Sequence, residues 1–189
     1  MAAFGAKYIK YAQIKAEAEN ALPTYEATKA KVIGLLVKAD FSPTYASGEL
    51  YADDKLAEKQ EEFISGTIAV ELDELEDDTA ALIYGNTLSE TDERVDNSKD
   101  NAPYGGLGYI KTLLKNGVKF YRAYYYPKVR AVIGNDSANT KSNSITFATA
   151  PTSFTVYEAN NGDWRQTKKF DTEAAAKAWI DSKLGNAAV

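Results

Sequence analysis

Short segments with strand-like alternation of apolar and polar residues occupy the first quarter of the chain. Residues 7–14 (KYIKYAQI) mix β-branched and aromatic residues with polar ones, a pattern typical of strands. Residues 31–39 are apolar and rich in β-branched residues, and Gly34 argues against a helix there. Ser42-Pro43 is expected to break the chain. We predict a further extended piece over 44–52.

A charged stretch separates these segments from a regular strand and a helix. Residues 53–62 (DDKLAEKQEE) fit either a short helix or an exposed loop. Residues 63–73 then alternate, and the apolar or glycine positions from Ile64 to Leu72 share one parity, which predicts one buried face. Asp77 or Asp78 is placed to cap a helix that ends at Gly85.

The middle of the chain predicts a loop followed by a hairpin. Residues 86–101 are polar and rich in turn formers, so we expect a mobile loop. Strands are predicted over 106–115 and 118–126, because Asn116-Gly117 between them is a strong type I′ turn signal. Pro127 should interrupt the second strand, with 128–133 as a short strand or a bulged continuation.

The C-terminal third predicts more strands and a final helix. Residues 134–143 are expected to be loop, and 144–150 and 153–159 to be strands separated by Pro151. Asn161-Gly162 suggests a hairpin turn into a strand over 164–170. The last segment is expected to form a helix from Thr172 to Gly185, with its apolar stripe formed by Ala175, Ala178, Trp179 and Leu184.

Together these elements predict a mainly β (α+β) fold, an antiparallel β-sandwich or barrel with one or two flanking helices, because no long crossover helices separate the strands. A chain of 189 residues fits a single domain over 1–189. The C-terminal helix 172–184 is either part of that domain or an appended element.

The composition removes much of enzyme chemistry. The chain contains no cysteine and no histidine, which excludes disulfides, thiolate metal sites and every Ser-His or Cys-His pair. The carboxylates between Asp73 and Asp78 lack the spacing of a calcium loop and are better explained as a helix start. Gly105, Gly106 and Gly108 open a strand rather than a helix, which favours a bulge or a close backbone approach over a phosphate loop. We therefore expect no enzyme, no cofactor and no metal site.

Charge is distributed unevenly along the chain. Residues 49–100 carry a net charge of −13, whereas residues 1–48 carry +2 and residues 101–189 carry +6. A free subunit of this kind would tend to associate head to tail, acidic surface against basic surface. The alternative is that the acidic segment is a solvated loop region.

A tyrosine cluster offers a second feature with two interpretations. Tyr121, Tyr124, Tyr125 and Tyr126 surround Arg122 and could form a stacking platform for single-stranded nucleic acid or sugar. The favoured interpretation is a strand with aromatic residues on both faces, one in the core and one at a contact with another subunit.

Several stretches resemble the major tail proteins of long-tailed (siphovirus-type) phages of Gram-positive bacteria, which are the subunits of the tail tube. The most specific elements are Leu50-Tyr51-Ala52-Asp53-Asp54, Phe63-x-x-Gly66-Thr67, and the segment from Pro103-Tyr104 to Gly108-Tyr109 with its hairpin. The blocks FGAKYIKYAQI, SITFATAPTSFTVY and GDWRQTKKF extend the resemblance over most of the chain.

The resemblance implies a non-enzymatic structural protein of the virion tail, assembled in the host cytoplasm and without a membrane partner. Its copies would form hexameric rings that stack head to tail into a hollow tube. Its partners would be the tape measure protein, the tail terminator and distal tail proteins, and double-stranded DNA passing non-specifically through an acidic lumen.

Within that interpretation residues 49–62 are hypothesised to form a long inter-subunit or inter-ring loop. The candidate contacts between subunits are Leu50, Tyr51, Asp53, Asp54, Lys55, Glu58, Tyr121, Tyr124, Tyr125 and Tyr126. The alternative functions are a β-sandwich module that binds glycans or cell surfaces, and a hydrolase built on paired carboxylates.

Overall fold

Strands and two helices account for most of the computed structural model, which describes residues 2–52, 55–91, 93–135 and 149–185. One antiparallel sheet has the strand order β2-β1-β7-β8-β9-β4-β3, β10 pairs with β8, and β5 pairs with β6 in a separate small hairpin. The mainly β fold class is confirmed. The elements are β1 (Ala2–Ala16), β2 (Thr24–Val32), β3 (Leu36–Ala52), β4 (Lys55–Leu72), α1 (Asp77–Tyr84), β5 (Thr87–Leu88), β6 (Arg94–Val95), β7 (Tyr104–Lys115), β8 (Val118–Ile133), β9 (Ala150–Tyr157), β10 (Gln166–Phe170) and α2 (Glu173–Lys183).

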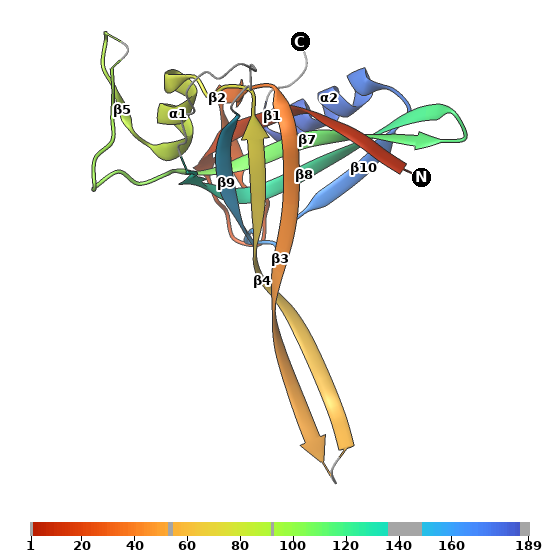
Figure 1. Cartoon of the computed structure of the whole chain (residues 1–189). Helices are drawn as coiled ribbons and strands as arrows, with labels where there is room; N and C mark the ends of the chain where they lie inside the picture. Colours follow the sequence, from red (N-terminus) through yellow and green to blue (C-terminus); the bar gives the residue numbers. More distant parts are fainter. Residues whose placement is uncertain (1, 53–54, 92, 136–148, 186–189) are drawn as a thin grey trace, which may run out of the picture.

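The large sheet folds over on itself at β8, which changes partner along one edge. Residues 121–125 of β8 pair with β10, and residues 128–133 pair with β9, while the other edge pairs with β7. Pro127 lies at the change of partner, where its missing N–H costs no ladder hydrogen bond. The strand therefore passes through Pro127 as a bulged continuation, with a register shift opposite Gly105 and Leu107. Figure 1 shows β3, β4 and β9 crossing over β1, β7 and β8 as a second layer.

The main core lies between these two layers. Alternate positions of each strand point into it, as the period of two requires. Its largest fully buried members include Tyr11, Ile68, Leu107, Tyr126 and Phe154. On β4 the predicted parity is confirmed at Gly66, Ile68, Val70 and Leu72 but not at Ile64, which is exposed.

A second core forms where α2 covers the outer face of β1, β7 and β8. Ala176, Ile180 and Leu184 are buried at intervals of four, so they share one helix face. The predicted stripe was wrong at Ala175 and Ala178, which are exposed. The opposite face of β8 contributes Ala123 and Tyr125 to this cluster, so α2 is an integral part of the fold.

Ion pairs attach α2 to β1. Lys10 is buried and its Nζ lies 2.5 Å from Asp181 Oδ1, to which the Tyr8 hydroxyl also donates a hydrogen bond at 2.7 Å. Lys7 pairs with Glu173 at 2.6 Å, and this hydrogen bond lowers the pKa of Glu173. A buried charge needs such a partner, so the register between helix and strand is well specified.

Predicted turns and helix ends agree with the structure where local chemistry decides them. Asn116 and Gly117 both have positive φ angles, 51° and 78°, as a type I′ turn requires. Gly85 ends α1 in the left-handed conformation, and the Thr172 hydroxyl accepts a hydrogen bond from the Ala175 amide at the start of α2. The cap of α1 was predicted wrongly, because Glu76 is the N-cap residue and it makes no side-chain cap hydrogen bond.

The glycines near the start of β7 are explained by close approach, as expected. A Cβ atom on Gly105 would lie 2.3 Å from the ring of the buried Tyr11. On Gly108 it would lie 2.6 Å from Cγ2 of Ile180, so α2 packs directly on the backbone of β7.

Other predicted boundaries were wrong because pairing with distant strands overrides local signals. β3 continues through Pro43 and β9 through Pro151, both paired to β4. The expected strand 31–39 is interrupted around Gly34, because β2 ends at Val32 and β3 begins at Leu36. Residues 136–148, which hold most of the expected loop 134–143 and of the strand 144–150, lie outside the described residues.

Two further loop predictions need correction. Asn161-Gly162 does not join a hairpin, because β10 pairs with β8 rather than with β9. The polar tract 86–101 contains the short hairpin β5-β6, in which Thr87 pairs with Val95.

Candidate assembly surface

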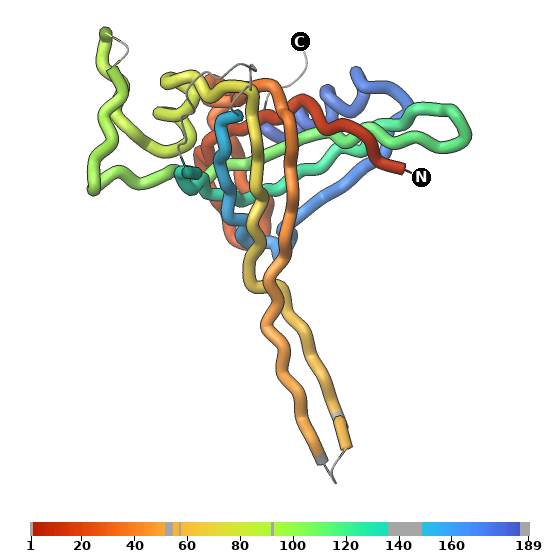
Figure 2. Tube along the Cα trace, viewed as in Figure 1, coloured from red at the N-terminus to blue at the C-terminus, as the bar shows by residue number. Residues whose placement is uncertain are grey.

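The most conspicuous feature of the molecule is a two-stranded arm formed by the distal halves of β3 and β4. β4 pairs with β9 only from Gly66 to Leu72, and the preceding residues of β4 pair with β3 alone. Figures 1 and 2 show this ribbon projecting away from the two layers. We call residues 44–52 and 55–65 the arm. At about 3.3 Å per residue its length is roughly 30 Å.

The expectation of a helix or loop over 53–62 is corrected, because residues 55–62 are strand. Glu49 pairs with Lys59 and Leu50 with Glu58 across the ribbon. Lys59 Nζ lies 2.9 Å from Glu61 Oε1 and 3.7 Å from Glu49 Oε1. The opposite charges of Glu49 and Lys59 face each other across the two strands and support their pairing. From the sequence alone, the same residues resemble a charged loop.

Large apolar side chains on the arm are open to solvent. Leu50 is 59% exposed, Tyr51 63% and Leu56 50%, and Tyr45 and Ile64 are exposed as well. A two-stranded ribbon is marginally stable in water unless a third strand, a helix or another surface covers it. Exposed apolar groups on such a ribbon make it a candidate interaction surface.

Stacked aromatic rings hold the base of the arm to the body. Trp164 stacks on Phe63 of β4 with ring centroids 4.3 Å apart, and on Phe41 of β3 at 5.5 Å. Phe41 also packs on Tyr126 at 5.4 Å, and Phe63 meets Tyr45 edge to face at 6.0 Å. This continuous row of rings fixes the direction in which the arm leaves the body.

The structure divides the predicted contact residues into two groups. Leu50, Tyr51, Lys55 and Glu58 lie together on the arm and are exposed. Asp53 and Asp54 lie outside the described residues. The four tyrosines of β8 lie on the body and are not part of this surface.

Tyr125 and Tyr126 must be removed from the set of candidate contacts. They are 1% and 0% exposed in the single chain, so neither side chain offers contact area to another subunit. Burial raises the pKa of Tyr125 to about 12, and its hydroxyl stays protonated in a hydrogen bond with that of Tyr25. Tyr121 and Tyr124 are half-buried, and Tyr124 stacks on Tyr109 at 5.1 Å.

The physical reason is that the middle of β8, from Ala123 to Val129, is covered on both faces within one chain. Its core face packs between the two layers, and its other face packs under α2. The prediction that another copy covers the second face was therefore wrong for this stretch of the strand. The sequence signal for the correct answer was the helix itself, whose buried face is provided by Ala176, Ile180 and Leu184.

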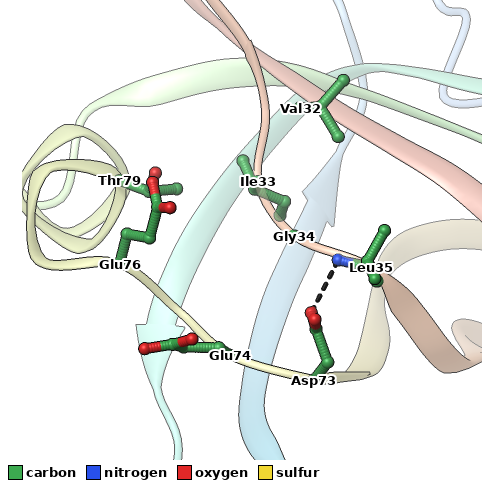
Figure 3. A pocket seen from close by; sticks show the side chains of 8 residues that line it. All are labelled: Val32, Ile33, Gly34, Leu35, Asp73, Glu74, Glu76 and Thr79. Carbon is green, nitrogen blue, oxygen red and sulfur yellow. Dashed lines mark hydrogen bonds between the residues drawn. The ribbon is translucent and has the colours of Figure 1, made fainter.

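Pockets border the acidic segment, and one of about 370 Å³ lies between Asp73, Tyr84 and Pro151. Figure 3 shows a pocket of about 230 Å³ between the β2–β3 turn and the start of α1, where the Leu35 amide donates a hydrogen bond of 2.7 Å to Asp73 Oδ1. This volume is below the range of about 300–1,000 Å³ that is usual for ligand sites. Within the part of the chain that the structure describes, no group of three or more Asp or Glu side chains is arranged to hold a metal ion.

No protein-family model matches the chain, and no curated protein matches its sequence. Among the described residues, no helix combines the length and the apolar character needed to cross a membrane. The class that the geometry defines is a mainly β protein with an exposed two-stranded arm.

Proposed function

We propose that this protein is the structural subunit of a phage tail tube, a non-enzymatic virion protein whose copies form stacked hexameric rings around a channel for DNA. The resemblance over most of the chain suggests the family. The observation that carries the proposal is the arm, a two-stranded ribbon with exposed apolar and charged side chains, whose strands pair only with each other among the described residues.

The open edges of the sheet are a second observation that supports self-assembly. In the order β2-β1-β7-β8-β9-β4-β3, the outer edges of β2 and β3 have no strand partner among the described residues. Open edges invite pairing with other chains, and a closed ring of subunits removes them. Head-to-tail stacking needs two different surfaces on each subunit, which the uneven charge distribution supplies.

The proposal is tested by imaging the purified chain with negative-stain electron microscopy over a wide range of protein concentration. We expect rings or hollow filaments of uniform diameter. A monodisperse monomer at every protein and salt concentration would overturn the proposal. If that monomer bound glycans, it would instead support the alternative of a binding module.

We assign the lumen to the face of the β3-β4-β9 layer that points away from the core. Ser42, Thr67 and Thr155 form one cross-strand row on it, and Asp40, Ala69 and Ser153 form the next. These rows hold small side chains and one charged residue, Asp40, so they offer no cation to the phosphates of DNA. In a ring, the other side of the subunit, where α2 covers β1, β7 and β8, would face outward. The added width of α2 fits the larger outer circumference.

Single cysteines test this assignment, because the chain contains none of its own. Thr67→Cys should react with a bulky polyethylene-glycol maleimide in free subunits but not in assembled tubes. Ala178→Cys, on the exposed side of α2, should react in both states. The opposite pattern of labelling would place α2 in the lumen.

A further inference from the structure

A row of three unpaired cations crosses the part of the body formed by β7, β8 and β10. Lys111 lies opposite Arg122 in the β7-β8 ladder, and Lys169 lies opposite Arg122 in the β8-β10 ladder. Directly paired residues of an antiparallel sheet point to the same face, so the three side chains stand side by side. We call these three residues the basic row.

Like charges opposite each other in a sheet destabilise it, so such a row calls for a compensating anion. Among the described residues, none of the three has a carboxylate oxygen within 4 Å, whereas Lys7, Lys10 and Lys128 are each paired. The surroundings add more positive charge, because residues 112–121 hold two further lysines, Lys115 and Lys119, and no acidic residue.

Aromatic rings border the basic row on both sides. Lys111 Nζ lies 5.4 Å from the ring centre of Tyr124 and 5.9 Å from that of Tyr109. Lys169 Nζ lies 3.6 Å from the ring centre of Phe120. A ligand for this surface should therefore combine carboxylates with apolar side chains.

The arm combines carboxylates with apolar side chains in this way. Residues 49–62 hold six acidic and two basic residues, and Leu50, Tyr51 and Leu56 are exposed among them. Glu58 and Glu62 share one face of the ribbon, since alternate residues of a strand point the same way. The arm projects away from its own body (Figure 1), so it cannot reach the basic row of the same chain while β4 stays paired with β9.

We propose that the basic row is the docking surface for the arm of a second copy of this chain, with arm carboxylates against Lys111, Arg122 and Lys169. This inference rests on the proposed self-assembly and names the contact that drives it. Each copy offers one arm and one basic row, so the contact is heterologous and propagates from subunit to subunit. Attraction between oppositely charged surfaces also speeds their encounter at low salt.

Two charge-reversal variants test the contact. The body variant carries Lys111→Glu, Arg122→Glu and Lys169→Glu, and the arm variant carries Glu58→Lys and Glu62→Lys, which lie on one face of the ribbon. Each alone places like charges in the contact, and its assembly should need at least about tenfold more protein than the wild type, measured by sedimentation velocity. A mixture of the two should assemble, because each arm then meets a body of opposite charge.

The controls separate this contact from changes in net charge or folding. Lys15→Glu, Lys29→Glu and Lys99→Glu together make the same change in net charge away from the basic row and should leave assembly unchanged. Circular dichroism checks the fold of each variant, and the neutral set Lys111→Gln, Arg122→Gln and Lys169→Gln should weaken assembly to a smaller degree.

The outcomes are distinguishable. If the wild type assembles and the body variant assembles equally well, the docking surface is wrong while the tail-tube proposal stands. If the body variant assembles normally but loses affinity for DNA, the row binds phosphates instead. A wild type that never self-associates overturns both proposals.

Discussion

Replacing residues 46–62 by Asn-Gly should give a folded subunit that no longer assembles. Tyr45 and Phe63 are a cross-strand pair, and a two-residue Asn-Gly loop closes such a pair as a type I′ turn. The shortened ribbon keeps the aromatic contacts of Phe63 with Trp164 and Tyr45. Because the described residues of the removed part pair only with each other, we expect the cooperative thermal transition to be retained, and rings or filaments to disappear in electron micrographs.

A matched control uses the other exposed hairpin. Leu88 and Arg94 pair across β5 and β6, so Asn-Gly in place of residues 89–93 shortens that hairpin with the same turn. The unfolding midpoint of this control variant shows how an engineered Asn-Gly turn affects stability. The control variant should still form tubes. Normal tubes from the variant without the arm would contradict the role of the arm in assembly.

A double-mutant cycle between Gly108 and Ile180 should show strong coupling between β7 and α2. Ile180→Ala removes a fully buried side chain and should lower the free energy of unfolding by about 2–4 kcal/mol. Gly108→Ala places a methyl group 2.6 Å from Cγ2 of Ile180, which should cost roughly 1–3 kcal/mol. In the double variant the new methyl group occupies space that the isoleucine has vacated.

The double variant should therefore be more stable than the sum of the single effects predicts, by at least about 0.5 kcal/mol, measured by urea unfolding. Ile180→Val serves as a milder version, with a loss of about 1 kcal/mol, if Ile180→Ala fails to fold. Strict additivity, or negligible effects of both single changes, would mean that α2 is an appended element rather than part of the core.

Local chemistry alone determined one hairpin turn, the C-terminal end of α1, the start of α2 and the buried face of β4. Asn116-Gly117 adopts positive φ at both positions, Gly85 ends α1, and Thr172 caps α2. The alternation from Gly66 to Leu72 identified the buried face of β4. Each of these depends on side chains within a few residues of each other, so the sequence contains them directly.

Tertiary structure alone decided which strands pair and which faces are covered. Pro127 is tolerated because β8 changes from β10 to β9 at that point, and the charged stretch of the arm is strand because it pairs along its length with β3. Tyr125 is buried under α2 by Ile180, which is 55 positions away in the sequence, and the basic row joins cations from three strands. Neither the period of a segment nor its turn chemistry specifies contacts at that separation, because they arise only when the layers pack.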